Sequence, residues 1–235
     1  MTTPDNAHDT VATVLNGTPL DQLPALLIPA FGQTLLMVGV VMAIVFVLGL
    51  PLGVIASNTG ARGLFPRPRL HALLSAVISL GRSLPFLVLM AAIIPFTLLV
   101  TGTTIGIPAA IVPMVVAGTP FFARLVENSL REVPGAVTDL ARAAGGSPLQ
   151  VIVHAQLSEA WPAILANLTV NTIGMIEYSA IAGTIGAGGI GYVAVTYGYQ
   201  RFDHAVMLAT VVILVVTVGV VQTVGDAFVR RARRG

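Results

Sequence analysis

Long runs of apolar residues, separated by short polar segments, are the dominant pattern along the chain. Five runs cover residues 35–55, 72–100, 105–123, 161–182 and 205–228, all approximately. About 20 apolar residues in helical form cross the hydrocarbon core of a bilayer. The pattern therefore predicts an all-α, polytopic membrane protein with about five transmembrane helices.

Two of the runs carry residues that would interrupt a helix in water. Arg82-Ser83-Leu84-Pro85 divides the second run, which predicts a tilted lead-in helix, a kink at Pro85 and then a span to Val100. The third run contains three prolines, at positions 108, 113 and 120. Neighbouring helices in a membrane bundle can satisfy the backbone groups that proline leaves free, so we keep this run as a span.

The arginines give the expected orientation. Ten of the twelve basic residues lie in three segments: after the first span, between the third and fourth spans, and at the C-terminus. Five spans place these segments on one side, which the positive-inside rule makes cytoplasmic. The opposite side holds only Arg201, close to Asp203. We expect an external tail over residues 1–30, an external N-terminus, and a basic cytoplasmic tail over 229–235.

The amino-acid composition excludes several classes of function for this chain. Only 9% of the residues are charged, against about 25% in soluble domains. The chain has no Cys, which excludes disulfides and thiolate metal sites. All its basic residues are Arg, so it lacks the Lys of a phosphate-binding P-loop and cannot be a P-loop ATPase. The arginines lie between apolar runs, which favours membrane topology over nucleic-acid binding. We expect neither an enzyme nor a bound cofactor.

The connection between the third and fourth spans is long and patterned. Pro134 suits the first turn of a helix, Gly145-Gly146 would end it, and Ser147-Pro148 would begin another. The first helix has an apolar stripe at positions 133, 137, 140, 141 and 144, and the second at positions 149, 152, 153 and 157. The spacing predicts a helical pair over 134–157 that offers a surface to another protein. A pair that only packs on its own membrane domain fits the periodicity equally well.

Motifs within and beyond this connection resemble one family. Asp139-Leu140-Ala141, followed by Gly145 and then Leu157-Ser158-Glu159-Ala160, resembles the EAA loop of ABC importer permeases. Further matching stretches are Arg82-Ser83-Leu84-Pro85-Phe86, Ile94-Pro95-Phe96-Thr97, Pro120 to Asn128, Tyr178-Ser179-Ala180 and Tyr197 to Phe202. Together, in order over residues 31–222, they resemble the permeases of methionine importers.

The resemblance implies a type I ABC transmembrane domain over residues 31–222 in a bacterial cell membrane. Its coupling helix would dock on a separate ATP-binding subunit through Asp139, Leu140, Ala141, Ala144, Gly145, Gly146 and Glu159. It also implies a homodimer, two ATP-binding subunits, an external substrate-binding lipoprotein and import of D- or L-methionine or a derivative. This chain departs from the family pattern with Asp139 for Glu, Leu140 for Ala, and Ser158 for Pro.

A glycine cluster follows the fourth span. Gly186, Gly188, Gly189 and Gly191 match the spacing of a dinucleotide-binding loop, but that loop requires a βαβ unit. Close backbone packing at the outer mouth, where a substrate-binding protein could dock, is the interpretation that we favour.

Glu177 is an ionisable residue inside the fourth span, and such residues commonly serve function. With Tyr178 and Ser179 it is a candidate for the translocation pathway, and a structural hydrogen bond is the alternative. An ion-coupled secondary amino-acid transporter is the alternative function. It would require an intramembrane acid, for which Glu177 is the candidate.

Overall fold

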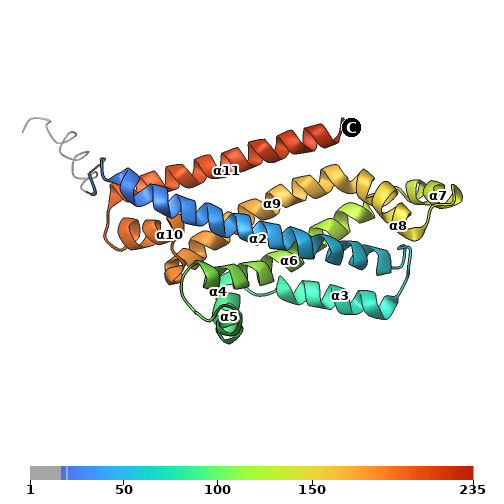
Figure 1. The fold of residues 1–235 in the computed structure, drawn as a ribbon, viewed down its shortest axis with the longest axis horizontal. Helices are drawn as coiled ribbons and strands as arrows, with labels where there is room; N and C mark the ends of the chain where they lie inside the picture. Colours follow the sequence, from blue (N-terminus) through green and yellow to red (C-terminus); the bar gives the residue numbers. More distant parts are fainter. Residues whose placement is uncertain (1–16, 20, 235) are drawn as a thin grey trace, which may run out of the picture.

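The computed structural model describes residues 17–19 and 21–234, which form an elongated helical bundle (Figure 1). The α-helices are α2 (Leu23–Thr59), α3 (Pro68–Gly81), α4 (Phe86–Ala92), α5 (Ile94–Thr101), α6 (Ile107–Arg131), α7 (Gly135–Ala143), α8 (Pro148–Gln150), α9 (Ser158–Ala182), α10 (Gly189–Val193) and α11 (His204–Ala232). Three π-helical stretches join them: η1 (Val151–Leu157), η2 (Gly183–Ala187) and η3 (Ala194–Tyr199). The described part of the chain is thus all-α, as predicted.

A few long helices could each span a membrane. Among the described residues, α2, α6 and α11 are each long and apolar enough to cross a bilayer. Two bent pairs raise the number to as many as five: α3 with α4, bent by 100°, and Pro148–Ala187 with Gly189–Tyr199, bent by 59°. The range includes the five spans expected from the sequence.

The second apolar run differs most from the prediction. No single straight helix covers residues 72–100, because α3 and α4 meet at 100° and a further break at Ile93 separates α4 from α5. Pro85 adopts an extended conformation (φ −55°, ψ 137°) ahead of α4. At about 1.5 Å per residue, the seven-residue α4 and the eight-residue α5 each fall far short of a 30 Å hydrocarbon core.

The long helices extend beyond their apolar runs. Helix α2 begins at Leu23, so residues 23–30 of the segment predicted as an external tail are helical. Most of the rest of that predicted tail lies outside the described residues. Helix α6 continues past residue 123 to Arg131. Helical hydrogen bonds form within the segment itself, so a helix need not end where its hydrophobic stretch ends.

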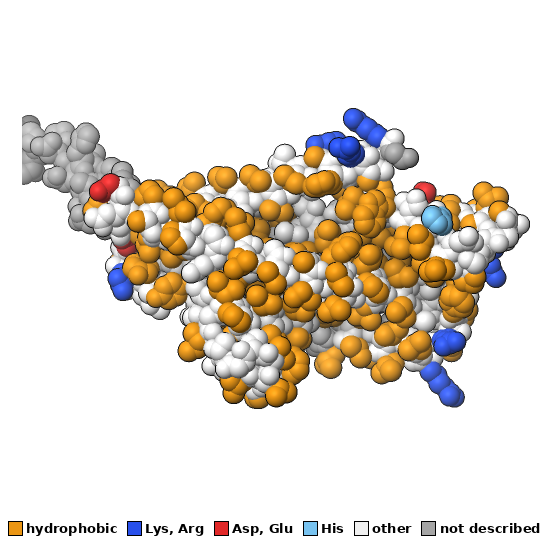
Figure 2. All heavy atoms as spheres, in the orientation of Figure 1, with side chains coloured by type: hydrophobic (Ala, Val, Ile, Leu, Met, Phe, Trp, Pro, Cys, Tyr) orange, Lys and Arg blue, Asp and Glu red, His pale blue; other side chains and the backbone are white. Residues whose placement is uncertain are grey.

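The core lies between α2, α6 and α9. Helix α2 packs along α6, and α9 packs against both α6 and α11. Fully buried side chains include Met37, Val41, Met114, Phe122 and Ile164. Large apolar side chains also cover much of the outer surface, while the basic side chains gather towards its ends (Figure 2). This distribution suits a protein surrounded by lipid.

The helical connection ends the bundle beside α2 and α3 (Figure 1). Gly145 adopts φ +83° just after α7, and the Ser147 side chain caps α8 by accepting from the Gln150 N–H at 3.4 Å. Both features match the predicted helix boundaries. The second predicted helix, however, is not separate from the fourth span, because α8, η1 and α9 run on from Pro148 to Ala182.

Candidate functional site

Helix α7 is an exposed element with no fully buried side chain. Val137 and Ala141 are half-buried, and α7 packs on η1. Leu140 is 72% exposed, and Leu149, at the start of α8, is 71% exposed. The predicted stripe therefore divides: some of its residues pack inward, whereas Leu140 and Ala144 face outward. Exposed leucines of this kind lie free for a contact outside the protomer.

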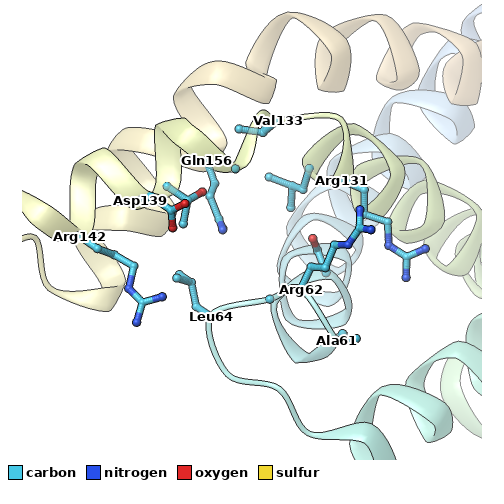
Figure 3. Close-up of a pocket in the computed structure, with 14 residues that line it drawn as sticks. Ala61, Arg62, Leu64, Arg131, Val133, Asp139, Arg142 and Gln156 are labelled. Atoms are coloured by element: carbon cyan, nitrogen blue, oxygen red, sulfur yellow. The ribbon is translucent and has the colours of Figure 1, made fainter.

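The remaining predicted docking residues lie on α7 or follow it in the chain. Asp139 is exposed, and its side chain points into a pocket between α7 and the loop that joins α2 to α3 (Figure 3). Gly145 has open space around it, whereas a Cβ on Gly146 would lie 2.8 Å from the Ala141 carbonyl oxygen. Glu159 lies exposed in the first turn of α9.

The pocket beside α7 has a volume of about 630 Å³. Its walls come from α2, α6, α7, η1 and the loop after α2, and its lining residues are Ser57, Gly60, Ala61, Arg62, Gly63, Leu64, Leu130, Arg131, Val133, Gly135, Thr138, Asp139, Arg142 and Gln156. Near it, the Asn58 Nδ2 donates to the Gln156 Oε1 at 3.0 Å. That hydrogen bond connects the end of α2 to η1.

A buried ionic cluster behind the pocket is absent from the sequence-based candidates. The Glu127 side chain is fully buried, and its two carboxylate oxygens each lie 2.6 Å from an arginine, Arg124 on one side and Arg131 on the other. Arg124 also donates to the Ser79 Oγ at 3.3 Å, which ties α6 to α3. The sequence signal is the spacing of 124, 127 and 131, which places three charges of alternating sign on one helix face.

The three candidate pathway residues point in different directions. Glu177 is exposed on the surface of the protomer. The Tyr178 ring stacks on Phe86, with centroids 4.3 Å apart and planes inclined by 2°. Ser179 is buried and donates to the Ile176 carbonyl at 2.7 Å. Successive helical residues are separated by about 100°, so three neighbours cannot line one surface. Of the three, Glu177 is exposed, Tyr178 is half-buried and Ser179 is buried within the protomer.

The glycine cluster forms a tightly packed turn between α9 and α10. Gly186, Gly188 and Gly189 all have positive φ, between 80° and 93°. A Cβ on Gly191 would lie 2.3 Å from the Ala180 carbonyl oxygen. The Gly189 N–H donates to the Gln33 Oε1 at 2.8 Å, which attaches the turn to α2. Gly189 and Gly191 are buried within the protomer, so they offer no surface to another protein.

Comparison with known proteins identifies this arrangement. Residues 49–234 match the model of the family described as binding-protein-dependent transport system inner membrane component. The chain belongs to this family. It is therefore a multi-pass inner membrane permease and the membrane component of a transport system, as the resemblance predicted.

Individual relatives place this permease more narrowly. It is 49% identical over 206 residues to a probable D-methionine transport system permease protein, MetI, of Vibrio cholerae, covering 88% of this chain and 92% of that one. It is 39% identical over 158 residues to the D-methionine transport system permease protein MetI of Escherichia coli, covering 67% and 73%.

Solved structures agree with this placement. A chain from inward-facing conformations of the MetNI methionine ABC transporter superimposes with a TM-score of 0.88 at 37% identity, covering 92% of this permease and 99% of that chain. An amino acid ABC transporter solved with histidines has a TM-score of 0.70 at 18% identity and shares the fold.

Proposed function

We propose that this permease is the transmembrane subunit of an ATP-driven importer of methionine, in its D- or L-form or as a related derivative. The observation that carries the proposal is 49% identity over nearly the whole chain to a D-methionine transport permease. The exposed α7 supports it, because an importer that binds no ATP itself requires a surface for the subunit that does. ATP is bound by that partner, and the permease carries out no catalysis.

The assembly that we propose is a homodimer of permeases with two ATP-binding subunits and an external substrate-binding lipoprotein. The similarity to a MetNI chain and the family's binding-protein-dependent description support it. The N-terminus would lie outside and the C-terminus in the cytoplasm, because the α7 end carries Arg62, Arg131 and Arg142. Helix α7 would then meet the ATP-binding subunit through Leu140 and its exposed neighbours, with Asp139, Gly145 and Glu159 nearby.

The mechanism that follows is alternating access driven from the cytoplasmic end. ATP binding would bring the two ATP-binding subunits together and displace α7. Helix α7 packs on η1, which continues without a break into α9, so displacement of α7 reaches the membrane. ATP can shift the conformational equilibrium only when the contact with α7 is stronger in one state than in the other.

At the outer end, we assign contact with the binding protein to exposed side chains around the glycine turn, such as Ile185 and Tyr192, and not to the buried glycines. We keep Glu177 as a candidate for the translocation pathway. Its exposed carboxylate is costly against lipid, which favours a position facing the second permease or a water-filled path.

The test is uptake of radiolabelled methionine by proteoliposomes that contain the permease, its ATP-binding subunit and its binding protein. Uptake should require internal ATP and be inhibited by an excess of unlabelled D- or L-methionine. Vesicles without ATP that carry an imposed proton or sodium gradient are the control. Uptake in those vesicles would instead support the ion-coupled alternative and contradict the proposal.

A further inference from the structure

The pocket beside α7 has a surplus of positive charge. Three guanidinium groups line it, from Arg62, Arg131 and Arg142, against the single carboxylate of Asp139. Glu127, directly behind, pairs with Arg131 and with Arg124 at 2.6 Å each, so its one negative charge is shared between these two arginines. At least one positive charge therefore remains uncompensated in the pocket.

The surplus positive charge is carried by Arg62 and Arg142, the two pocket arginines without a carboxylate partner in the described part of the chain. Among residues 17–19 and 21–234, neither forms an ion pair with a carboxylate. The two side chains come from different walls of the pocket, the loop after α2 and helix α7 (Figure 3). A guanidinium presents a planar fork of N–H donors that matches the oxygens of a phosphate. Two guanidinium groups that line one cavity could together bind one anion.

The other lining groups complete a polar site. Thr138 and Gln156 add a hydroxyl and an amide to the lining of the pocket. The pocket volume of about 630 Å³ is large enough for a phosphate-bearing headgroup. Its walls all come from one protomer, so the site does not depend on a second chain.

The exposed leucines form a different surface. Leu140 and Leu149 are the most exposed large apolar side chains of this end, and neither lines the pocket. A contact made through these leucines therefore does not itself occupy the pocket, and Asp139 is the residue that the pocket shares with the proposed docking set.

We propose that this pocket binds a phosphate group, either the phosphodiester of an anionic phospholipid or free inorganic phosphate, between Arg62 and Arg142. The single negative charge of a phosphodiester matches the one positive charge that remains at minimum in the site. The bound anion joins the loop after α2 to α7, so it restrains α7 relative to the membrane domain. Binding of the anion would thereby make α7 move less readily with the ATP-binding subunit.

The test compares two double variants of the permease, purified in complex with its ATP-binding subunit. R62Q/R142Q removes both guanidinium groups, and R67Q/R69Q removes the same amount of charge from the start of α3, outside the pocket. Binding of a fluorescent phosphatidylglycerol is measured in phosphatidylcholine nanodiscs without ATP. R62Q/R142Q should weaken binding at least tenfold, and R67Q/R69Q by less than twofold. R62K/R142K keeps the charge but loses the forks, and should give an intermediate loss without loss of fold.

Inorganic phosphate distinguishes the two sources. Displacement of phosphatidylglycerol by millimolar phosphate identifies free phosphate as a ligand, and resistance to displacement identifies the lipid; either result supports the site. Equal loss in both double variants would show a general charge effect and overturn the proposal. It would also be overturned if R62Q/R142Q kept full anion binding, or lost its ATP-binding subunit during purification, because the pocket would then belong to the contact with that subunit.

Discussion

The Nη2 of Arg131 lies 2.6 Å from the Oε1 of Glu127, whose side chain is completely buried in the protomer. Arg124 meets the other carboxylate oxygen at the same distance. The carboxylate is thus enclosed between two cations on its own helix, and one of them reaches across to α3. This cluster fixes the end of α6 that forms a wall of the pocket beside α7.

Substituting Glu127 should therefore destabilise the protomer. E127Q retains the shape of the side chain but leaves two arginines facing a neutral amide. Removing one partner of a buried ion pair costs about 3–5 kcal/mol, and the partial exposure of Arg131 places this case at the lower end. The melting temperature of the detergent-solubilised complex should fall by several degrees. E132Q, at the exposed end of the same helix, should leave it unchanged, and equal melting temperatures for both variants would contradict the structural role.

The packing of the glycine turn leads to a second prediction about stability. G191A would place a Cβ 2.3 Å from the Ala180 carbonyl oxygen, a contact that requires backbone movement. Such overpacking costs about 1–3 kcal/mol. The matched control is G174A in α9, where a new Cβ meets nothing within 4 Å. Thermal unfolding should separate the two variants, and a destabilised G174A beside an unchanged G191A would refute the packing described for the turn.

Asp203 should contribute to stability in a pH-dependent way. Burial acts to raise its pKa, but hydrogen bonds from Thr18 and from the Val206 N–H outweigh burial, so the pKa lies below the ordinary aspartate value. A lowered pKa gives stabilisation that is complete above the unfolded-state pKa, about 3.9, and is lost as pH falls below it.

D203N tests this dependence: Asn is as good an N-cap as Asp and keeps one oxygen that can accept from the Val206 N–H, but it loses the charge and the second oxygen, which accepts from Thr18. Melting curves between pH 3 and pH 7 should show a smaller loss of stability at acid pH in D203N than in the unsubstituted protein. The control is D21N, which removes an exposed carboxylate. If the acid dependence of D203N and of the unsubstituted protein coincided, Asp203 would not be the group responsible.

Leu140 should matter for coupling and little for folding. It is 72% exposed, so truncation to alanine removes few contacts within the protomer. Residues that anchor a protein interface often cost more than 1 kcal/mol on truncation, which corresponds to about fivefold in affinity. We expect L140A to lower ATP-driven uptake by about fivefold at unchanged melting temperature. L99A, at an 82% exposed leucine of α5, should transport normally, and equal uptake by both variants would disprove the docking assignment.

The sequence predicted what depends on local pattern. The helix boundaries around Gly145 and Ser147 follow from backbone and capping chemistry, which a sequence displays directly. The family followed from motifs in order along the chain, and the family match confirms it. The 100° turn ahead of α4 was predicted only as a kink, because a proline specifies a break and not the angle, which packing determines.

Burial was harder to predict, because it depends on which helix face meets a neighbour. The sequence singles out Glu177 as an acid inside an apolar run, yet among residues 17–19 and 21–234 the buried acid is Glu127. Glu127 stands among polar residues in sequence, and only the packing of α6 on α2 and α9 encloses it. Glu177 lies on the face of α9 that its own protomer leaves uncovered.

Helix α2 is fastened at two points along its length to one continuous stretch of chain. Asn58 holds η1 near the C-terminal end of α2, while Gln33 and Thr34, in its N-terminal third, hold the first residues of α10, through hydrogen bonds of 2.8–3.0 Å. Neither α2 nor α9 can tilt alone without breaking one set of these bonds. The two helices therefore form a single stiff frame, and a transport cycle would move them as a pair, with α11 packed on α9 and exposing most of its apolar surface outside the protomer.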